Sequence, residues 1–222
     1  NKIKYHKFFV TILLDKENKK KLPKFKFKLN KLIVGQINMS KKRNIAAKKF
    51  SSKYIAFIDS DASPNKFWLN LAVKYLKSKK ADIVGGPGII FPNQNHSQKI
   101  CYLSSRSYYV TGYQNFRKYK AKAKYCDWLE SCNIIMERLF YLRHGGMDNN
   151  KYTGEDKEFF DRVKKRKTDL KVFYSPDLFI YHRQRGPKGY LMQRFCFGMD
   201  IINLIKLNYG IKGLQPIFPI LF

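Results

Sequence analysis

Runs of apolar residues that end at polar or turn-forming residues give the first picture of this chain. Residues 8–14 (FFVTILL) are almost continuously apolar and rich in branched side chains, which predicts a buried strand of a parallel sheet that ends at Asp15. Residues 54–58 (YIAFI) predict a second strand of this kind. Shorter strands are predicted at residues 32–34, 81–85, 131–136, 171–174 and 178–182.

Helical spacing of apolar residues fills several intervals between these strands. Ser40 can cap a helix that runs to residue 50, and Ser63-Pro64 can supply the cap and first residue of a helix with Trp68 on its apolar face. Two more helices are predicted, over residues 137–144 and from residues 153–156 onward. Because strands and helices alternate, the sequence predicts an α/β fold with a mostly parallel sheet flanked by helices.

The carboxyl-terminal part of the chain has a different pattern. We expect residues 1–186 to form one domain and residues 187–222 to form a separate amphipathic and apolar segment. An apolar stripe and nearby basic residues suit either a helix on an anionic membrane or a helix that closes the domain. The stripe consists of Leu191, Phe195, Ile202 and Ile205, and the basic residues are Lys188, Arg194, Lys206 and Lys212.

The clearest candidate chemistry lies in Asp59 and Asp61, which follow the strand at residues 54–58. Side chains two residues apart on an extended backbone point the same way, and carboxylate oxygens suit hard ions such as Mg²⁺ or Mn²⁺. Ligands of such sheets bind beyond the carboxyl ends of the strands, where Asp15 is also expected. The alternative is a simple turn, because Asp and Ser both favour strand-to-helix corners.

The chain is strongly basic, with 45 Lys and Arg against 16 Asp and Glu and a net charge of +29. Such a surface suits nucleic acid or an anionic membrane leaflet. The basic residues are spread along the chain and accompany no zinc-finger spacing or RNP-like motif, so no specific nucleic acid is expected. No apolar run reaches the roughly 20 residues that span a bilayer, and no signal peptide is visible.

The cysteines fall in no recognised metal-ligand spacing, which predicts the reduced thiols of a cytosolic protein. They are Cys101, Cys126, Cys132 and Cys196.

The order of several motifs resembles that of the family 2 glycosyltransferases, which are inverting enzymes with the GT-A fold. The resemblance covers about residues 8–200. The motifs are Arg43-Asn44, Tyr54 to Asp61 followed by Pro64 and Trp68-Leu69, Ser131-Cys-Asn133, Gly145-Gly-Met-Asp148, Gly154-Glu-Asp156, Tyr174-Ser-Pro-Asp177 with Tyr181-His182, and Phe195-Cys-Phe-Gly198. The resemblance implies the Rossmann-like GT-A fold of nucleotide-diphospho-sugar transferases, a nucleotide-diphosphate sugar as donor, and Mn²⁺ or Mg²⁺ as cofactor.

The resemblance also implies roles for individual residues. Asp61 is expected to bind the metal, with Asp59 contacting the metal and the ribose or sugar of the donor. His182 is expected to complete the metal shell, although a histidine at a strand end can equally be satisfied by its neighbours. Asp15 is expected to contact the nucleoside, and Arg43-Asn44 the sugar or phosphate side of the donor.

The catalytic base is expected in the second motif block. Inversion needs a carboxylate that takes the proton of the acceptor hydroxyl. Asp156 is the first candidate and Glu155 the second. The alternative is structural, because Thr153 and Asp156 also read as a capping box at a helix start where acids are favourable.

Other expectations concern the whole protein. The chain begins at Asn1 and has no counterpart of the family's first strand before Phe8, so we expect an amino-terminally truncated piece that lacks this strand. Residues 96–125 show little periodicity and are expected to form an irregular acceptor-side region. The resemblance implies a glycan or lipid-linked acceptor, polysaccharide or lipopolysaccharide-type synthesis, and a place at the cytoplasmic face of the membrane.

Two other functions compete with sugar transfer. The first is a basic module that binds nucleic acid or an anionic membrane without catalysis. The second is a nucleotidyltransferase, which would use similar carboxylates but would give no role to Gly154-Glu-Asp156.

Overall fold

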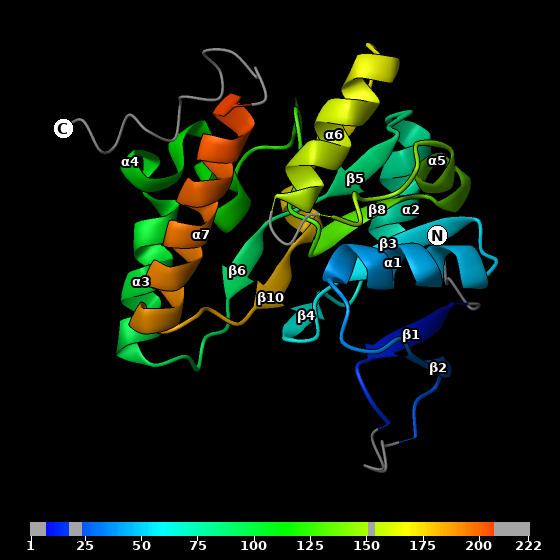
Figure 1. Ribbon diagram of the computed structural model, residues 1–222, viewed down its shortest axis with the longest axis horizontal. Helices are drawn as coiled ribbons and strands as arrows, with labels where there is room; N and C mark the ends of the chain where they lie inside the picture. The colour runs from blue at the N-terminus through cyan, green and yellow to red at the C-terminus, as the bar shows by residue number, and fades with distance from the viewer. Residues whose placement is uncertain (1–7, 18–23, 151–153, 207–222) are drawn as a thin grey trace.

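The computed structural model describes residues 8–17, 24–150 and 154–206, with side chains up to residue 199 (Figure 1). The strands are β1 (Phe9–Leu14), β2 (Lys28–Ile33), β3 (Tyr54–Ile58), β4 (Ala62–Pro64), β5 (Ile83–Gly85), β6 (Gly88–Ile90), β7 (Lys124–Cys126), β8 (Asn133–Glu137), β9 (Val172–Tyr174) and β10 (Ile180–His182). The helices are α1 (Met39–Lys49), α2 (Trp68–Ser78), α3 (His96–Arg106), α4 (Tyr108–Thr111), α5 (Arg138–Arg143), α6 (Glu155–Arg166) and α7 (Pro187–Lys206), with 3₁₀ helices η1 (Gly112–Lys118) and η2 (Pro176–Leu178).

The central sheet is mixed, which corrects the expectation of a mostly parallel sheet. Its strand order is β3-β8-β5-β9-β7, and β5 with β9 is its parallel pair. The chain enters β8 from the edge at which β3 and β5 end, because Asn133 lies opposite Ile58 and Ile134 opposite Gly85. β8 therefore runs antiparallel to both neighbours and brings the residues just before it to the ends of those strands.

A second sheet lies beside the first and has the order β4-β10-β6. In it β10 runs parallel to β6 and antiparallel to β4. The predicted α/β architecture is thus present, and strands far apart in the sequence are neighbours in both sheets.

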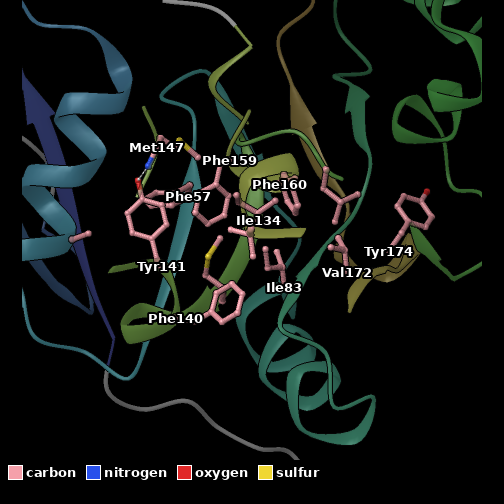
Figure 2. Packing of buried hydrophobic residues seen from close by; sticks show 14 of the residues in the cluster. Phe57, Ile83, Ile134, Phe140, Tyr141, Met147, Phe159, Phe160, Val172 and Tyr174 are labelled. Atoms are coloured by element: carbon pink, nitrogen blue, oxygen red, sulfur yellow. Dashed lines mark hydrogen bonds between the residues drawn. The ribbon is translucent and has the colours of Figure 1, made fainter. Parts of the chain in front are cut away.

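Alternation of side chains along the central strands builds a core on each face of the sheet. On β8, Ile134 and Met136 enter one cluster and Ile135 enters the other. The first cluster also holds Tyr141 of α5 and Phe159 of α6, whose rings pack 5.4 Å apart between centroids (Figure 2). Helix α2 covers the opposite face. The strand expected at residues 54–58 is confirmed.

β1 and β2 form a separate parallel pair at the edge of the described structure, next to α1 (Figure 1). Parallel pairing is as expected, but every residue of β1 is only partly buried. The expectation of a buried strand is therefore wrong here, because β1 has a strand neighbour on one side alone among the described residues.

Two helix starts differ from expectation. Asn38 rather than Ser40 caps α1, because its Oδ1 accepts a 2.9 Å hydrogen bond from the Lys41 amide. Ser63-Pro64 belongs to β4, where pairing with β10 outweighs the helix-start signal. An edge strand tolerates proline, since its free side needs no N–H donor. Helix α2 begins four residues later, at Trp68.

Residues 96–125 are more regular than expected and contain α3, α4, η1 and part of β7. The start of α3 carries a capping box. Asn95 Oδ1 accepts from the Gln98 amide at 2.9 Å, and Gln98 Oε1 accepts from the Asn95 amide at 3.2 Å. Asn95 and Gln98 are thus the feature of the sequence from which this helix could have been predicted.

Helix α7 lies beside α3 (Figure 1), and the hydroxyl of Tyr190 donates to Ser104 Oγ at 3.2 Å. Leu191 and Phe195 of the expected stripe are each 66% exposed. The side chains of Ile202, Ile205 and Lys206 lie outside the described residues, as does the rest of the expected segment from residue 207 to 222, which includes Lys212. None of the helices described is both long and apolar enough to span a bilayer.

Candidate active site

The passage of the chain from β3 of the central sheet into β4 of the second sheet, and the pairing of β4 with β10, bring the predicted metal residues together. β3 ends immediately before Asp59, and β4 begins immediately after Asp61. β4 pairs with β10 so that Ala62 lies opposite His182. As a result, His182 Nε2 is 3.4 Å from Asp59 Oδ2 and 3.5 Å from Asp61 Oδ1.

A fourth side chain, Cys132, reaches the same place from the start of β8. One ligand atom each from Asp59, Cys132 and His182 lie within 4.8 Å of one another. Carboxylate, thiolate and imidazole are all metal ligands in proteins, so the donor set fits a divalent cation. Asp61 borders this group through His182.

The electrostatics at this point favour a positive charge. Burial alone would raise the pKa of Asp59, but the hydrogen bond with His182 and the charge of Arg43 hold it below its usual range. Burial would lower the pKa of His182, yet the hydrogen bond with Asp59 and the charge of Asp61 raise it. Both shifts have the sign expected where carboxylates can hold a cation.

Arg43 of α1 connects this end of the sheet to α6. Its Nη2 lies 3.2 Å from Asp59 Oδ1, and its Nη1 lies 3.1 Å from Glu155 Oε1. Nη1 also donates to Ser131 Oγ at 3.0 Å. The Arg43 side chain is 7% exposed, so it joins two carboxylates in a setting where ion pairs are little screened by solvent.

Asp156 lies one residue beyond Glu155 in the first turn of α6. Its carboxylate accepts hydrogen bonds from the Ser131 amide at 3.2 Å and the Lys157 amide at 2.8 Å. Burial and the neighbouring charge of Glu155 nevertheless raise the pKa of Asp156 to about 6. The first turn of a helix favours an ionised acid, but burial outweighs this effect at Asp156. The capping-box alternative involves Thr153, which lies outside the described residues.

Asn44 and Asp15, both predicted on the donor side, have different environments. Asn44 Nδ2 donates to the Met147 carbonyl oxygen and to Asn149 Oδ1. Asn44 Oδ1 accepts from the Met147 amide and from the Tyr141 hydroxyl. These four bonds use the full capacity of the amide, which assigns Asn44 to holding the loop after α5. Asp15 is half-exposed at the end of β1 and pairs with Lys42.

Two further residues contribute to the site: Ser131, which the sequence marked only as part of the Ser131-Cys-Asn133 motif, and Glu130, which lies in no motif. Glu130 accepts from Lys118 Nζ at 2.7 and 2.8 Å. Burial opposes ionisation, but Lys118 and Arg117 lower the pKa of Glu130 to about 2. Ser131 bonds both Arg43 and Asp156. Their positions depend on β8 running antiparallel to β3, and no local motif marks that pairing.

A pocket of about 310 Å³ opens beside Asp61. Two exposed arginines, Arg183 and Arg185, line it together with Gln98 and Gln184. Gln98 Nε2 donates to Gln184 O at 2.7 Å and so ties α3 to the segment between β10 and α7. The pocket thus places Asp61, which borders the metal group, beside side chains that can bind phosphate oxygens.

Comparisons with solved structures show which folds this chain resembles. A structure of GalNAc-T7 with UDP, GalNAc and Mn²⁺ is similar, with a TM-score of 0.51 and 13% identity over 72% of this chain and 33% of that chain. S. aureus TarS 1–349 gives a TM-score of 0.43 and 16% identity over 68% of this chain and 43% of that chain. The chain therefore spans a third to less than half of these proteins. No curated protein matches it.

The likeness to GalNAc-T7 is one of fold, and it confirms the predicted GT-A class. The sequence profile described as glycosyl transferase family 2 matches residues 17–144. This range holds Arg43, Asp59, Asp61 and Cys132, while Glu155, Asp156 and His182 lie beyond it. A match over more than half of the chain, together with this fold, identifies the group: the chain belongs to glycosyl transferase family 2.

Proposed function

We propose that this chain transfers a sugar from a nucleotide-diphosphate donor to an acceptor hydroxyl with inversion at the anomeric carbon. One observation carries the proposal. Arg43 joins Asp59, in the group suited to a metal, to Glu155, the neighbour of the perturbed Asp156. Glycosyl transfer needs stabilisation of charge on the leaving group and removal of a proton from the acceptor. The residues suited to these two tasks are thus connected through Arg43.

On the donor side, we assign metal binding to Asp61, Asp59 and His182. A divalent cation held there, Mn²⁺ or Mg²⁺, would neutralise charge on the diphosphate leaving group. Arg183 and Arg185 line the pocket next to Asp61 and supply further positive charge for phosphate oxygens. Arg43 faces the sugar or phosphate side, and Asp15 is assigned to the nucleoside. Asn44 drops out of this set because the loop after α5 occupies its amide.

On the acceptor side, Asp156 is assigned as the base. Its pKa of about 6 leaves it ionised at neutral pH and close enough to the working pH to accept a proton. The acceptor oxygen bonds to the anomeric carbon as the bond from that carbon to the diphosphate breaks, and the hydroxyl proton passes to Asp156. Glu155 is the second candidate, but its ion pair with Arg43 favours a positioning role.

Nucleotide binding that depends on a metal is the first expected result. Calorimetric titration with UDP and GDP should give binding in Mn²⁺ that weakens at least about tenfold with a chelator. Asp61→Asn should weaken it similarly, because Asp61 faces His182. Asp127→Asn is the matched control, since Asp127 is 57% exposed and pairs with Lys164. Absence of nucleotide binding, with tight nucleic-acid binding in moderate salt, would favour the basic-module function instead.

A membrane-associated acceptor is the second part of the proposal. Helices α3, α4 and α7 carry several exposed apolar side chains, and α3 contacts both of the other helices. These side chains are Ile100, Leu103, Tyr108, Tyr109, Leu191, Met192 and Phe195. Exposed Arg183, Arg185 and Lys188 lie next to them in the sequence. Apolar side chains beside basic ones suit an anionic bilayer surface, and hence a glycan or lipid-linked acceptor in surface polysaccharide synthesis at the cytoplasmic face.

Sedimentation with lipid vesicles tests this surface. The chain should bind vesicles that contain anionic lipid, and salt should weaken the binding. Leu191→Gln with Phe195→Gln should weaken it at least about tenfold, because two apolar side chains no longer enter the lipid. Leu139→Gln with Phe67→Gln is the matched control, with exposures of 57% and 52% away from α7. Equal loss in both double variants would contradict the assignment of this face.

A further inference from the structure

Cys132 belongs to the Ser131-Cys-Asn133 motif, but it falls in no metal-ligand spacing of the sequence. Asn133 lies opposite Ile58 in the β3–β8 pair, so the residues next in line, Cys132 and Asp59, meet just beyond the paired strands. The thiol therefore joins Asp59 and His182, with the three ligand atoms within 4.8 Å of one another. The other described cysteines are outside this group. Cys126 of β7, for example, contacts the carbonyl oxygen of Trp128 at 3.7 Å.

The spacing of the group is suited to a small metal ion. Bonds of about 2.0 to 2.3 Å to oxygen, nitrogen and sulfur place tetrahedral ligands roughly 3.5 Å apart. Asp59 Oδ2 and His182 Nε2 are already 3.4 Å apart. The Cys132 sulfur lies within 4.8 Å of both ligand atoms.

The chemistry of the donors differs from a set made only of oxygen and nitrogen. Sulfur is a soft ligand that binds Zn²⁺ and Co²⁺ well, whereas Mg²⁺ prefers hard oxygen ligands and octahedral geometry. A cysteine among the ligands therefore changes which ions the site prefers. On coordination the thiol loses its proton to solvent and the sulfur forms the metal bond.

We propose that Cys132 is a metal ligand together with Asp59 and His182, and that it makes the cation site selective for thiophilic divalent ions over Mg²⁺. This inference rests on the proposed metal site and goes beyond it in naming a thiolate ligand. The site then takes Zn²⁺ or Co²⁺ more tightly than Mg²⁺, and Mn²⁺ lies between them.

Cobalt spectroscopy of the chain tests the thiolate directly. Co²⁺ should produce a sulfur-to-cobalt charge-transfer band in the near ultraviolet, and Zn²⁺ should abolish the band at far lower concentration than Mg²⁺. Cys132→Ser should remove the band and weaken Co²⁺ binding at least about tenfold. Cys126→Ser is the matched control, since Cys126 is also a partly buried thiol. It should keep the band, because Cys126 is outside the group of Asp59, Cys132 and His182.

Three results would overturn the proposal, and they are distinguishable. Co²⁺ that binds by calorimetry without a charge-transfer band removes the thiolate ligand but leaves the metal site. A band that persists in Cys132→Ser assigns the sulfur elsewhere. Absence of Co²⁺ binding removes both the ligand and the metal site of the proposed function.

In the wild-type chain, Zn²⁺ should also protect one thiol from alkylation, which tests the proposal without a variant.

Discussion

Replacing Asp156 with asparagine is expected to lower kcat/KM for sugar transfer by about 10²- to 10⁴-fold, the usual contribution of a general base. Binding of the nucleotide is expected to change little, because the donor residues lie across Arg43 from Asp156. Steady-state kinetics and nucleotide titration of the same variant separate the two effects. Asp161→Asn, on the same helix, is the matched control, since Asp161 pairs with Lys157. Near-normal turnover in Asp156→Asn would remove the assignment.

The pH dependence of the wild-type chain should report the same group. A base must be ionised, so kcat/KM should fall as the pH drops through about 6, the pKa of Asp156. The same shift acts on stability with a defined sign. A pKa raised above its unfolded value gives stability that is present below the unfolded pKa and lost as the pH rises through about 6.

The free energy of unfolding of Asp156→Asn, measured by urea denaturation, should therefore exceed that of the wild type by about 1 to 3 kcal/mol at pH 8. The difference should disappear near pH 4. A variant that is inactive yet more stable distinguishes a catalytic carboxylate from a structural cap. Loss of a cap would instead destabilise the chain by about 1 kcal/mol.

Replacing Arg43 with methionine should lower the free energy of unfolding by about 3 to 5 kcal/mol at neutral pH. The substitution removes the cation and leaves Glu155, whose side chain is 15% exposed, without its described ion-pair partner. Asp59 also loses its ion pair with Arg43. Urea denaturation measures the loss. Lys41→Met is the control, because Lys41 is an exposed basic residue of the same helix.

The Arg43 effect should shrink in acid. The pKa of Asp59 lies below its usual range in the folded chain, so the stabilisation from its pairs is present at neutral pH and disappears as the pH falls through that pKa. An Arg43→Met deficit that stays constant from pH 7 to acid would contradict ion pairing as its cause.

Features that depend on local sequence were the predictable ones. The apolar run at residues 54–58 located β3, and the Asp-x-Asp motif followed it as expected. The local signal failed at Ser63-Pro64, where the cap and proline pattern of a helix was used by an edge strand instead. There the partner strand β10, which lies more than a hundred residues away, decided the conformation.

The sequence placed Ser131 and Cys132 in a motif, but it did not predict the contacts that these residues make. Cys132 and Ser131 reach Asp59 and Arg43 because β8 runs antiparallel beside β3, and a sequence of one strand does not encode the direction of its neighbour. Asn44 is the opposite case, because its motif points to the donor whereas its hydrogen bonds go to the loop after α5. The backbone of Met147 returns to the amide and uses its hydrogen bonds.

The ion pairs of α1 have a mechanical consequence. Lys42 and Arg43 are consecutive, so they leave the helix about 100° apart and reach Asp15 on one side and Asp59 with Glu155 on the other. Helix α1 thus contacts the β1–β2 pair through Lys42 and both parts of the candidate site through Arg43. A tilt of α1 that separates Lys42 from Asp15 is expected to lengthen the Arg43 ion pairs as well, so the spacing between Asp59 and Glu155 depends on where this helix lies.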